Sequence, residues 1–464
     1  MNQAPTAIEE DDDDGPSLIG LVVAIISVIT MGVFWSLNQA APNFWWVILF
    51  LFTEVIVISI VIWQACDPFA DVAQWIGDVF QVPGSVRGAT LDAIASSMPE
   101  LFCGIFFVLV AISVAGDSEA ALLNAGAEGY GSTIATCAGS AVYNMILIPA
   151  ACAIFISFYR KNRPTIDVDD EVISRDGMWF VGCEMLLILF LFQDAMQWWM
   201  AITFLGLYCV YVVQLFRDAK RYRYKLAEAK KVFEQLGAEC HTKEVVKSLS
   251  QNGVRISHTV VVKARQEFLE NSDTDDSNDN NESTESVGLF FGYVNIPLNH
   301  TTAWPIIIAS TIVAATACYF LVEVTRQTAA ELAVPTFFVA VILAAAASSV
   351  PDTFLSIGSA MRGDDSGAVS NAFGSNIFDI CICLSIPLLV NSYLTGWQPV
   401  SLLQDGEPIA GLTGLRILLV VLTLVTLAII WHNRQLTRNK AFVLCGLYGI
   451  FILYAVLGSL GIMF

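Results

Sequence analysis

The sequence predicts an all-α polytopic membrane protein, and three observations support that prediction. The chain of 464 residues is 56% hydrophobic and 14% charged, with a mean hydropathy of +0.64, whereas a soluble domain is nearer a quarter charged. Its apolar residues fall in runs long enough to cross a bilayer as helices, and the sequence lacks the short alternating segments of a transmembrane β-barrel. Within these runs a polar motif occurs twice, once in each half of the chain.

The apolar runs predict about 11 transmembrane helices. An acidic tail at 1–16 precedes an extra N-terminal helix at 17–36, which we expect to be retained because no basic signal-peptide region precedes it. The first half then contributes five helices, at 43–64, 83–114, 131–157, 177–194 and 197–216. The second half contributes five more, at 303–323, 332–358, 367–392, 412–431 and 441–463. The predicted domains are therefore a first repeat at 43–216, a cytoplasmic regulatory or linker loop at 217–302 and a second repeat at 303–464.

The helix count fixes how the two halves are related. Five is odd, so the second half enters the membrane from the opposite side and the repeats are inverted. Basic residues occupy three loops that this topology places on one side, namely Arg160, Lys161 and Arg163; Arg217, Lys220, Arg221, Arg223 and Lys225; and Arg434, Arg438 and Lys440. The loops at 115–130 and 393–411 contain neither Lys nor Arg. The positive-inside rule then places the N-terminus and the central loop in the cytoplasm and the C-terminus outside.

The net charge of -20 and the 11 cysteines say little about the function. Much of the charge comes from Glu9–Asp14 and Glu270–Glu285, which are predicted to be solvated and disordered. The cysteines are scattered, without the spacing of a metal site or a disulfide framework. The basic stretch from Arg217 to Lys231 is expected to continue the preceding helix as a positively charged flank.

The repeated motif supplies oxygen ligands. Its first copy reads AIASSMPELF at 93–102 and its second AAASSVPDTF at 345–354; GSAVYN at 139–144 and GSNIFD at 374–379 follow them. Residues four apart share a helix face, which pairs Ser96 with Glu100 and Ser375 with Asp379. A proline inside a helix also removes the hydrogen-bond partner of a carbonyl one turn earlier. Carboxylates, hydroxyls and free carbonyls suit Na+ and Ca2+ rather than zinc or copper.

Bringing the halves together places Glu100, Asp352, Asp379 and Asn144 around one midplane site. Three buried carboxylates are too costly to leave without counter-charge, so the site should bind Ca2+, Na+ or protons in competition. Competition for one site that opens to each side in turn is antiport. The plainer interpretation of each serine is a hydrogen bond to its own backbone, and that of each proline is a kink; their repetition in register favours the ion site.

These motifs resemble those of the cation/Ca2+ exchanger superfamily and are most similar to its K+-dependent Na+/Ca2+ exchanger branch. The similarity lies in both repeats, including the 27 residues that separate Asp352 from Asp379, and in Cys66-Asp67 and Gly88-Ala89-Thr90 before the first motif. The central loop and the chain ends do not take part in it. The resemblance implies a transporter rather than an enzyme, with no covalent cofactor, whose transported ions are Ca2+ and Na+.

The resemblance also implies roles for individual residues. Glu100 and Asp352 would be the central Ca2+ ligands, which Na+ also uses. The adjacent Na+ sites would be lined by Ser96, Ser97, Ser348, Ser349 and the carbonyls of Ala93 and Ala345, and the ring would be completed by Ser140, Asn144, Ser375 and Asp379. Members of the branch with Asp at the position of Asp379 bind K+, but some prokaryotic Na+/Ca2+ exchangers also have Asp there, so Asp379 permits K+ coupling without proving it.

The sequence departs from the family pattern in two places. Glu100 and Asn144 are 44 residues apart, which is 17 more than the equivalent gap in the second repeat, and the surplus around Gly116 to Gly131 is expected to form an outer turn or short helix. Asp92 adds an acid in the helix of Glu100, about 12 Å away along the axis. Three interpretations of Asp92 stay open: it lines the cytoplasmic approach, pairs with Arg87 or holds a proton.

Two other functions are weighed against Na+/Ca2+ exchange. A Ca2+/H+ antiporter would use the same carboxylates for protons. An intramembrane aspartyl protease would use Asp352 and Asp379 as a dyad, but its sequence motifs are absent and the repeated serines would have no purpose. We expect the partners to be ions and the lipid bilayer rather than nucleic acid, and the home membrane to be the plasma membrane.

Overall fold

The computed structural model describes residues 17–460 except for 81, 83, 117, 161–163, 169–172, 405–406, 410 and most of 238–285. The expectations for the acidic stretches at 9–14 and 270–285, for Lys161 and Arg163, and for the last four residues fall outside the described part of the chain.

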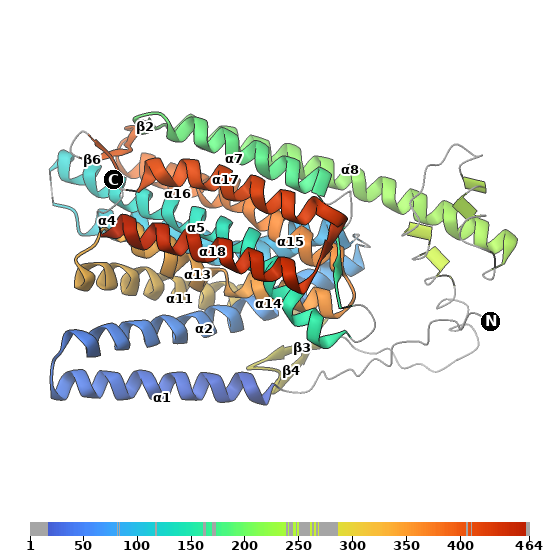
Figure 1. Cartoon of the computed structure of the whole chain (residues 1–464), viewed down its shortest axis with the longest axis horizontal. Helices are drawn as coiled ribbons and strands as arrows, with labels where there is room; N and C mark the ends of the chain where they lie inside the picture. Colours follow the sequence, from blue (N-terminus) through green and yellow to red (C-terminus); the bar gives the residue numbers. More distant parts are fainter. Residues whose placement is uncertain are drawn as a thin grey trace.

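The described elements are mostly helices that lie side by side in an elongated bundle (Figure 1). The first half contains α1 (Leu18–Ala40), α2 (Phe44–Val79), α3 (Gly84–Arg87), the π-helix η1 (Gly88–Asp92), α4 (Ala93–Ser113), α5 (Glu119–Tyr159), the π-helix η2 (Ile173–Gly177), α7 (Met178–Leu191) and α8 (Trp198–Leu236). The second half contains α11 (Ala303–Leu332), α12 (Thr336–Val339), the π-helix η3 (Ala340–Ala344), α13 (Ala345–Ser348), α14 (Val350–Met361), α15 (Asp365–Phe378), the π-helix η4 (Asp379–Cys383), α16 (Ser385–Leu394), α17 (Leu412–Trp431), the 3₁₀ turn η5 (His432–Arg434) and α18 (Arg438–Ser459).

The predicted class is confirmed: the chain is an all-α polytopic membrane protein. Within the described residues, 10 helical segments are long and apolar enough to cross a membrane. The span predicted at 177–194 corresponds to α7, whose 14 residues continue directly from η2. By itself α7 is shorter than the roughly 20 residues of a straight span.

The largest differences from the predicted boundaries are extensions of helices. α2 continues through Pro68 to Val79, which membrane helices tolerate because neighbouring groups satisfy the freed backbone. α5 begins at Glu119, so most of the surplus before the second motif is a helical extension of a span. α8 continues to Leu236, so the basic stretch after 216 is helical, as expected.

π-helical segments occur at equivalent positions of the two halves. η1 ends at Asp92 and η3 ends at Ala344, each eight residues before the acid of its repeat. A π turn holds an extra residue and re-aims the side chains that follow it, and such segments are frequent at functional sites. The shared position means that the same local distortion sets the orientation of both repeated motifs.

Short strands also pair the halves symmetrically. β1 (Ile166–Asp167) pairs with β8 (Gln435–Leu436), and β2 (Ala195–Met196) pairs with β5 (Val400–Ser401). β5 precedes α17 and β8 follows it, so these two ribbons lie at opposite ends of the bundle. The other two ribbons are local hairpins, β3 (Ser286–Leu289) with β4 (Val294–Pro297) and β6 (Leu403–Gln404) with β7 (Glu407–Pro408).

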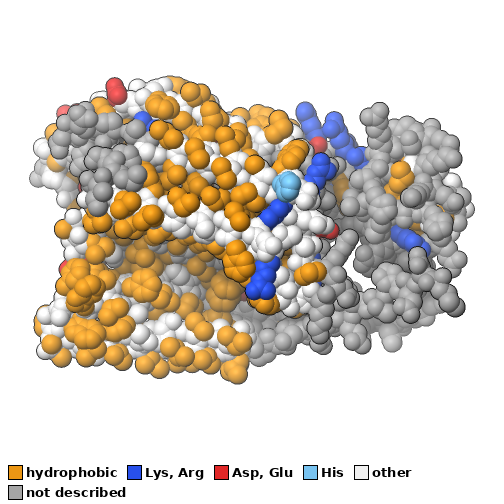
Figure 2. All heavy atoms as spheres, viewed as in Figure 1, with side chains coloured by type: hydrophobic (Ala, Val, Ile, Leu, Met, Phe, Trp, Pro, Cys, Tyr) orange, Lys and Arg blue, Asp and Glu red, His pale blue; other side chains and the backbone are white. Residues whose placement is uncertain are grey.

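The surface separates apolar sides from a basic end. Hydrophobic side chains cover the sides of the bundle, and most of the Lys and Arg side chains on the visible face gather toward the end from which α8 projects (Figure 2). α1 packs against α2 and has no buried residue. An apolar surface of this kind is stable in lipid, where side chains need no polar covering.

Candidate functional site

The repeated motifs meet at the centre of the bundle. Glu100 lies on α4, Ser140 and Asn144 on α5, Asp352 in the first turn of α14, Ser375 on α15 and Asp379 at the start of η4. All six side chains are fully buried, with no measurable exposure. Residues more than 200 positions apart are thus brought into direct contact, as the sequence predicted.

Two glycines allow this close approach. A Cβ at Gly139 would lie 2.6 Å from Ala345 Cβ and would overlap the carbonyl oxygen of Val341, while a Cβ at Gly374 would lie 2.6 Å from Ala89 Cα. Ala89 and Val341 occupy equivalent positions, eleven residues before the acids of their repeats. Each glycine therefore seats its helix against the same part of the opposite repeat.

Glu100 accepts hydrogen bonds from serine hydroxyls of both halves. Its Oε1 atom lies 3.2 Å from Ser140 Oγ and 3.2 Å from Ser349 Oγ. The two hydroxyls are also 2.9 Å from each other. Its second oxygen, Oε2, is buried and has no hydrogen-bond partner among the described residues.

Asp352 has the better-satisfied carboxylate. Ser375 Oγ donates to Asp352 Oδ1 at 2.7 Å, and the amide of Asn144 donates to Asp352 Oδ2 at 3.4 Å. The Asn144 amide also lies 3.3 Å from Ser140 Oγ. These contacts connect the acid of the second repeat to the amide of the first.

Asp379 shares its hydrogen-bond donor, the Ser140 hydroxyl, with Glu100. Its Oδ2 atom lies 3.0 Å from Ser140 Oγ, the hydroxyl that also faces Glu100. A serine hydroxyl carries a single hydrogen and can donate to only one carboxylate at a time. Asp379 Oδ1 is buried without a partner in the described structure.

The described site is therefore rich in acceptors and poor in donors. Four buried oxygens of the repeated motifs at the site lack a hydrogen-bond partner among the described residues: Glu100 Oε2, Asp379 Oδ1, Asn144 Oδ1 and Ser97 Oγ. A buried acceptor without a partner costs free energy, and a buried carboxylate costs considerably more. Cations coordinated by oxygen would satisfy these atoms.

The other serines of the first motif are placed differently from one another. Ser96 Oγ hydrogen-bonds the backbone oxygen of Asp92 at 2.9 Å and lies 3.3 Å from Ser375 Oγ, so it combines the backbone contact typical of membrane helices with a contact to the site. Ser97 is fully buried.

The second motif shows a similar division. Ser348 Oγ donates to the carbonyl of Ala345 at 3.2 Å, while Ser349 points into the site. The Ala345 carbonyl also accepts from the Ser349 N–H at 3.1 Å, and the Ala93 carbonyl lies 3.4 Å from Ser96 Oγ. Both carbonyls therefore already have partners in this conformation.

Asp92 lies outside this network. Its Oδ2 atom is 3.7 Å from Arg87 Nε, and Arg87 also lies 3.2 Å from Asp78 and 3.7 Å from Asp364. The distance fits the interpretation that Asp92 pairs with Arg87. The Arg87–Asp364 contact also joins the two repeats, because Arg87 ends α3 and Asp364 caps α15.

Glu184 is a second buried acid outside the site. It accepts a hydrogen bond from Thr423 Oγ1 at 2.9 Å, which joins α7 to α17. Glu184 thus serves as an internal polar partner between two helices.

Two asparagines make polar contacts that the sequence analysis missed, one inside the motif at 374–379 and one about a turn before it. Asn371 donates to Ser356 at 2.9 Å, and Asn376 donates to the carbonyl of Ala141 at 3.1 Å. Asn371 precedes Ser375 by four residues and Ser356 follows Asp352 by four. That spacing on a shared face was the available signal.

A further buried contact connects α8 to α15. Asp176 is fully buried and accepts hydrogen bonds from Tyr211 Oη at 3.1 Å and Ser370 Oγ at 2.7 Å, and it pairs with Arg175 at 2.6 Å. Ser370 lies five residues before Ser375 on α15. The network fixes the position of a helix that lines the site.

The candidate ligands of the site are oxygen atoms of both charged and neutral side chains. Among the described residues, no three His, Cys, Asp or Glu side chains are arranged to hold a metal ion. Serine and asparagine oxygens supply the remaining candidate ligands. Mixed neutral and charged oxygen sets suit Na+ and Ca2+.

Comparison with known proteins gives a family and several relatives. The profile of the family described as sodium/calcium exchanger protein matches residues 18–217 and 302–457, which is more than half of the chain. Sodium/potassium/calcium exchanger 2 of Homo sapiens is 30% identical over 139 residues, covering 30% of this chain and 20% of that protein. Sodium/potassium/calcium exchanger 1 of Bos taurus is 29% identical over 168 residues, covering 36% of this chain and 12% of that protein. The matches thus span well under two thirds of either relative.

A solved structure shares the fold over nearly the whole chain. The crystal structure of the H+/Ca2+ exchanger CAX superposes with a TM-score of 0.55 at 14% sequence identity, covering 96% of this chain and 93% of that one. Likeness at this level of identity speaks for the fold alone.

Proposed function

The chain belongs to the sodium/calcium exchanger protein family, and on that premise we propose that it is a secondary active antiporter that exchanges Ca2+ for Na+. The observation that carries the proposal is the donor shortage at the centre of the bundle. Three buried carboxylates share few hydroxyl hydrogens, and two of them keep an oxygen without a partner among the described residues. Such a site requires positive charge from a bound ion.

The proposed ligands follow from the contacts. Glu100 and Asp352 would bind Ca2+ from opposite sides, since each repeat contributes one of them. Na+ would use the same carboxylates together with nearby hydroxyl and carbonyl oxygens. This extended set comprises Ser96, Ser97, Ser140, Asn144, Ser348, Ser349, Ser375, Asp379 and the carbonyls of Ala93 and Ala345. Ca2+ and Na+ would then exclude each other because they need the same charges.

The inverted repeats support a mechanism of alternating access. The two halves would carry the same motif in opposite orientations relative to the membrane. If the halves exchange their conformations, a site that is open to one side becomes open to the other. The pairing of β1 with β8 and of β2 with β5 joins the halves at both ends of the bundle. Ion binding would shift the equilibrium between the inward-open and outward-open states only if the ion makes different contacts in the two states.

K+ co-transport is a finer part of the proposal and centres on Asp379. Asp379 stands where the first repeat has Asn144, so it adds a third negative charge. An additional monovalent cation would balance that charge while Ca2+ is bound. The relatives whose names include potassium make this ion the first to test.

We also propose an orientation and a membrane. The basic end of the bundle would face the cytoplasm, with the extension of α8 on the same side. The N-terminus and the central loop would then be cytoplasmic and the C-terminus extracytoplasmic. The plasma membrane is the proposed location.

The test is 45Ca2+ uptake by proteoliposomes loaded with Na+ and diluted into Na+-free buffer, with and without external K+. Uptake that needs internal Na+ supports the proposal, and stimulation by external K+ supports co-transport. Uptake driven by a pH gradient in the absence of Na+ would instead identify a Ca2+/H+ antiporter. Empty liposomes and the Glu100→Gln variant are the controls.

A further inference from the structure

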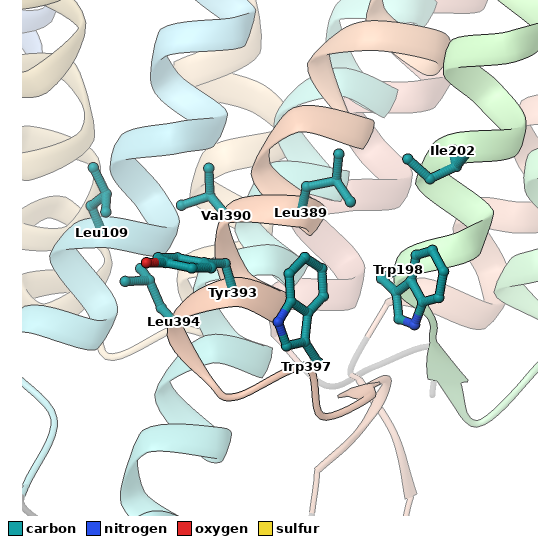
Figure 3. A pocket seen from close by; sticks show the side chains of 8 residues that line it. All are labelled: Leu109, Trp198, Ile202, Leu389, Val390, Tyr393, Leu394 and Trp397. Carbon is teal, nitrogen blue, oxygen red and sulfur yellow. The ribbon is translucent and has the colours of Figure 1, made fainter.

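A groove on the membrane-facing surface lies between α4, α8 and α16, apart from the site at the bundle centre. It has a volume of about 740 Å³. Its walls are formed by Leu109 of α4, Ile202 of α8, and Leu389 and Val390 of α16 (Figure 3). Leu394 and three aromatic residues complete the lining, and the aromatic residues, Trp198, Tyr393 and Trp397, are called the aromatic end below.

The depth of the groove follows from helix geometry. Leu109 is nine residues after Glu100 on the same helix, which is about 14 Å along the axis. Half of a bilayer's hydrocarbon core is about 15 Å. This placement rests on the proposed function, in which Glu100 lies near the midplane, and it puts Leu109 close to the hydrocarbon boundary. Trp198 begins α8 and Trp397 follows the end of α16, so the aromatic end lies at the headgroup level, where Trp and Tyr are favoured.

The aromatic end is held in one arrangement. The Trp397 ring lies 6.2 Å from the Trp198 ring and 6.3 Å from the Tyr393 ring, at interplanar angles of 79° and 80°. Edge-to-face pairs of this kind add to the stability of ring packing. The three side chains are 45%, 70% and 53% exposed for Trp198, Tyr393 and Trp397, so much of each ring remains available to a ligand.

The lining selects for an amphiphile without net charge. Among the residues that the structure describes, no Lys, Arg, Asp or Glu lines the groove, and its walls are aliphatic. The indole N–H groups and the tyrosine hydroxyl can donate to phosphate and ester oxygens, and aromatic faces attract a quaternary ammonium group. We propose that the groove binds one zwitterionic phospholipid, with an acyl chain along the walls and its headgroup at the aromatic end.

The groove is placed where a bound lipid touches both repeats. α4 carries Glu100, and α16 follows η4, which begins with Asp379. A lipid held between them contacts two helices that lead directly to the proposed ion ligands. Its binding is measured independently of transport, so failure of one proposal does not affect the test of the other.

The test is lipid retention by the full chain purified in detergent, followed by native mass spectrometry. The protein is mixed with equal amounts of phosphatidylcholine, phosphatidylglycerol and cholesterol. Wild type should retain one phosphatidylcholine in preference to the other two. Val390→Trp, which fills the groove, should lower that retention by about tenfold through steric exclusion.

Two further variants complete the experiment. Ile312→Trp on α11, an apolar surface position at 60% exposure and outside the groove, should retain phosphatidylcholine as wild type does. Trp397→Leu should lower retention about threefold, the worth of an aromatic contact, and provides the test if Val390→Trp does not fold. Equal retention by wild type, Val390→Trp and Trp397→Leu would overturn the proposal, as would a preference of wild type for phosphatidylglycerol or cholesterol.

Discussion

The two repeats carry the same motif on differently shaped backbones. In the first, α4 continues through Pro99 and α5 continues through Asn144 without a break. In the second, the helix is interrupted at Ser349, whose backbone has φ -85° and ψ 3°, and α15 gives way to a π-helix at Asp379. Both interruptions of the second repeat thus fall at or within three residues of its acids.

The difference indicates that the repeats contribute in different ways. An interrupted helix leaves backbone groups free to move or to bind, and transporters use such breaks at their ion sites. Asp352 also lies in the first turn of α14, where the helix dipole favours a negative charge. The backbone of the first repeat is therefore the more continuous one, and the proposed ligands of the second repeat lie on the more adaptable backbone.

The largest expected effect tests whether uptake needs the carboxylate of each repeat equally. Glu100→Gln and Asp352→Asn should each abolish Na+-dependent 45Ca2+ uptake, because each removes one of the charges that the cation requires. Glu184→Gln, which alters a buried acid outside the site, should keep uptake near wild type. Full activity in either site variant, with folding verified by size-exclusion chromatography, would contradict the site assignment.

The next prediction concerns a substitution that makes the second repeat resemble the first. Asp379→Asn gives both repeats an asparagine at this position and should remove any K+ requirement while Na+/Ca2+ exchange is retained. The measurement is 45Ca2+ uptake across a series of K+ concentrations. The exchanged variant Asn144→Asp/Asp379→Asn restores the charge on the opposite repeat and serves as the control. A flux in Asp379→Asn that still rises with K+ as in wild type would remove Asp379 from this role.

A third prediction concerns packing between the repeats. Gly139→Ala and Gly374→Ala should each lower the free energy of unfolding by about 1–3 kcal/mol, because the added methyl group overlaps backbone of the opposite repeat. Gly446 on α18 has nothing within 4 Å of such a methyl group, so Gly446→Ala is the matched control and should not destabilise. Denaturant titration in mixed micelles measures all three, and no loss at Gly139 would contradict the close approach.

The smallest expected effect concerns a hydrogen bond between the repeats, in which a side chain of the second repeat donates to the backbone of the first. Asn376→Ala removes the hydrogen bond to the carbonyl of Ala141 and should cost about 0.6–1.7 kcal/mol of unfolding free energy, the range for hydrogen bonds between membrane helices. Thr316→Val removes an exposed hydroxyl that bonds only its own helix, and should change stability less. A greater loss in Thr316→Val than in Asn376→Ala would show that this contact does not join the repeats.

Much of this arrangement could be predicted because the motifs repeat. Hydropathy gave the spans, and the paired acids and serines predicted that Glu100, Asp352 and Asp379 would meet. The π-helices η1 and η3 could not be predicted, because a helical period of 3.6 residues contains no signal for an added residue. The length of α5 was missed for a related reason, since the polar segment after 118 resembles a loop in composition but is helical through its continuity with the buried span.

The single helix α8 connects the membrane part of the protein to its far end as a stiff rod. Its 39 residues make it about 58 Å long, of which the membrane accounts for about 30 Å. Tyr211, which hydrogen-bonds Asp176 near α15, lies 25 residues before Leu236 and would be the pivot of any tilt of α8. A tilt of about 10° at that point would displace the far end by roughly 6–7 Å. If the proposed transport involves a tilt of α8, a small movement near the site would become a larger one at the tip of α8, where a spectroscopic label could time it.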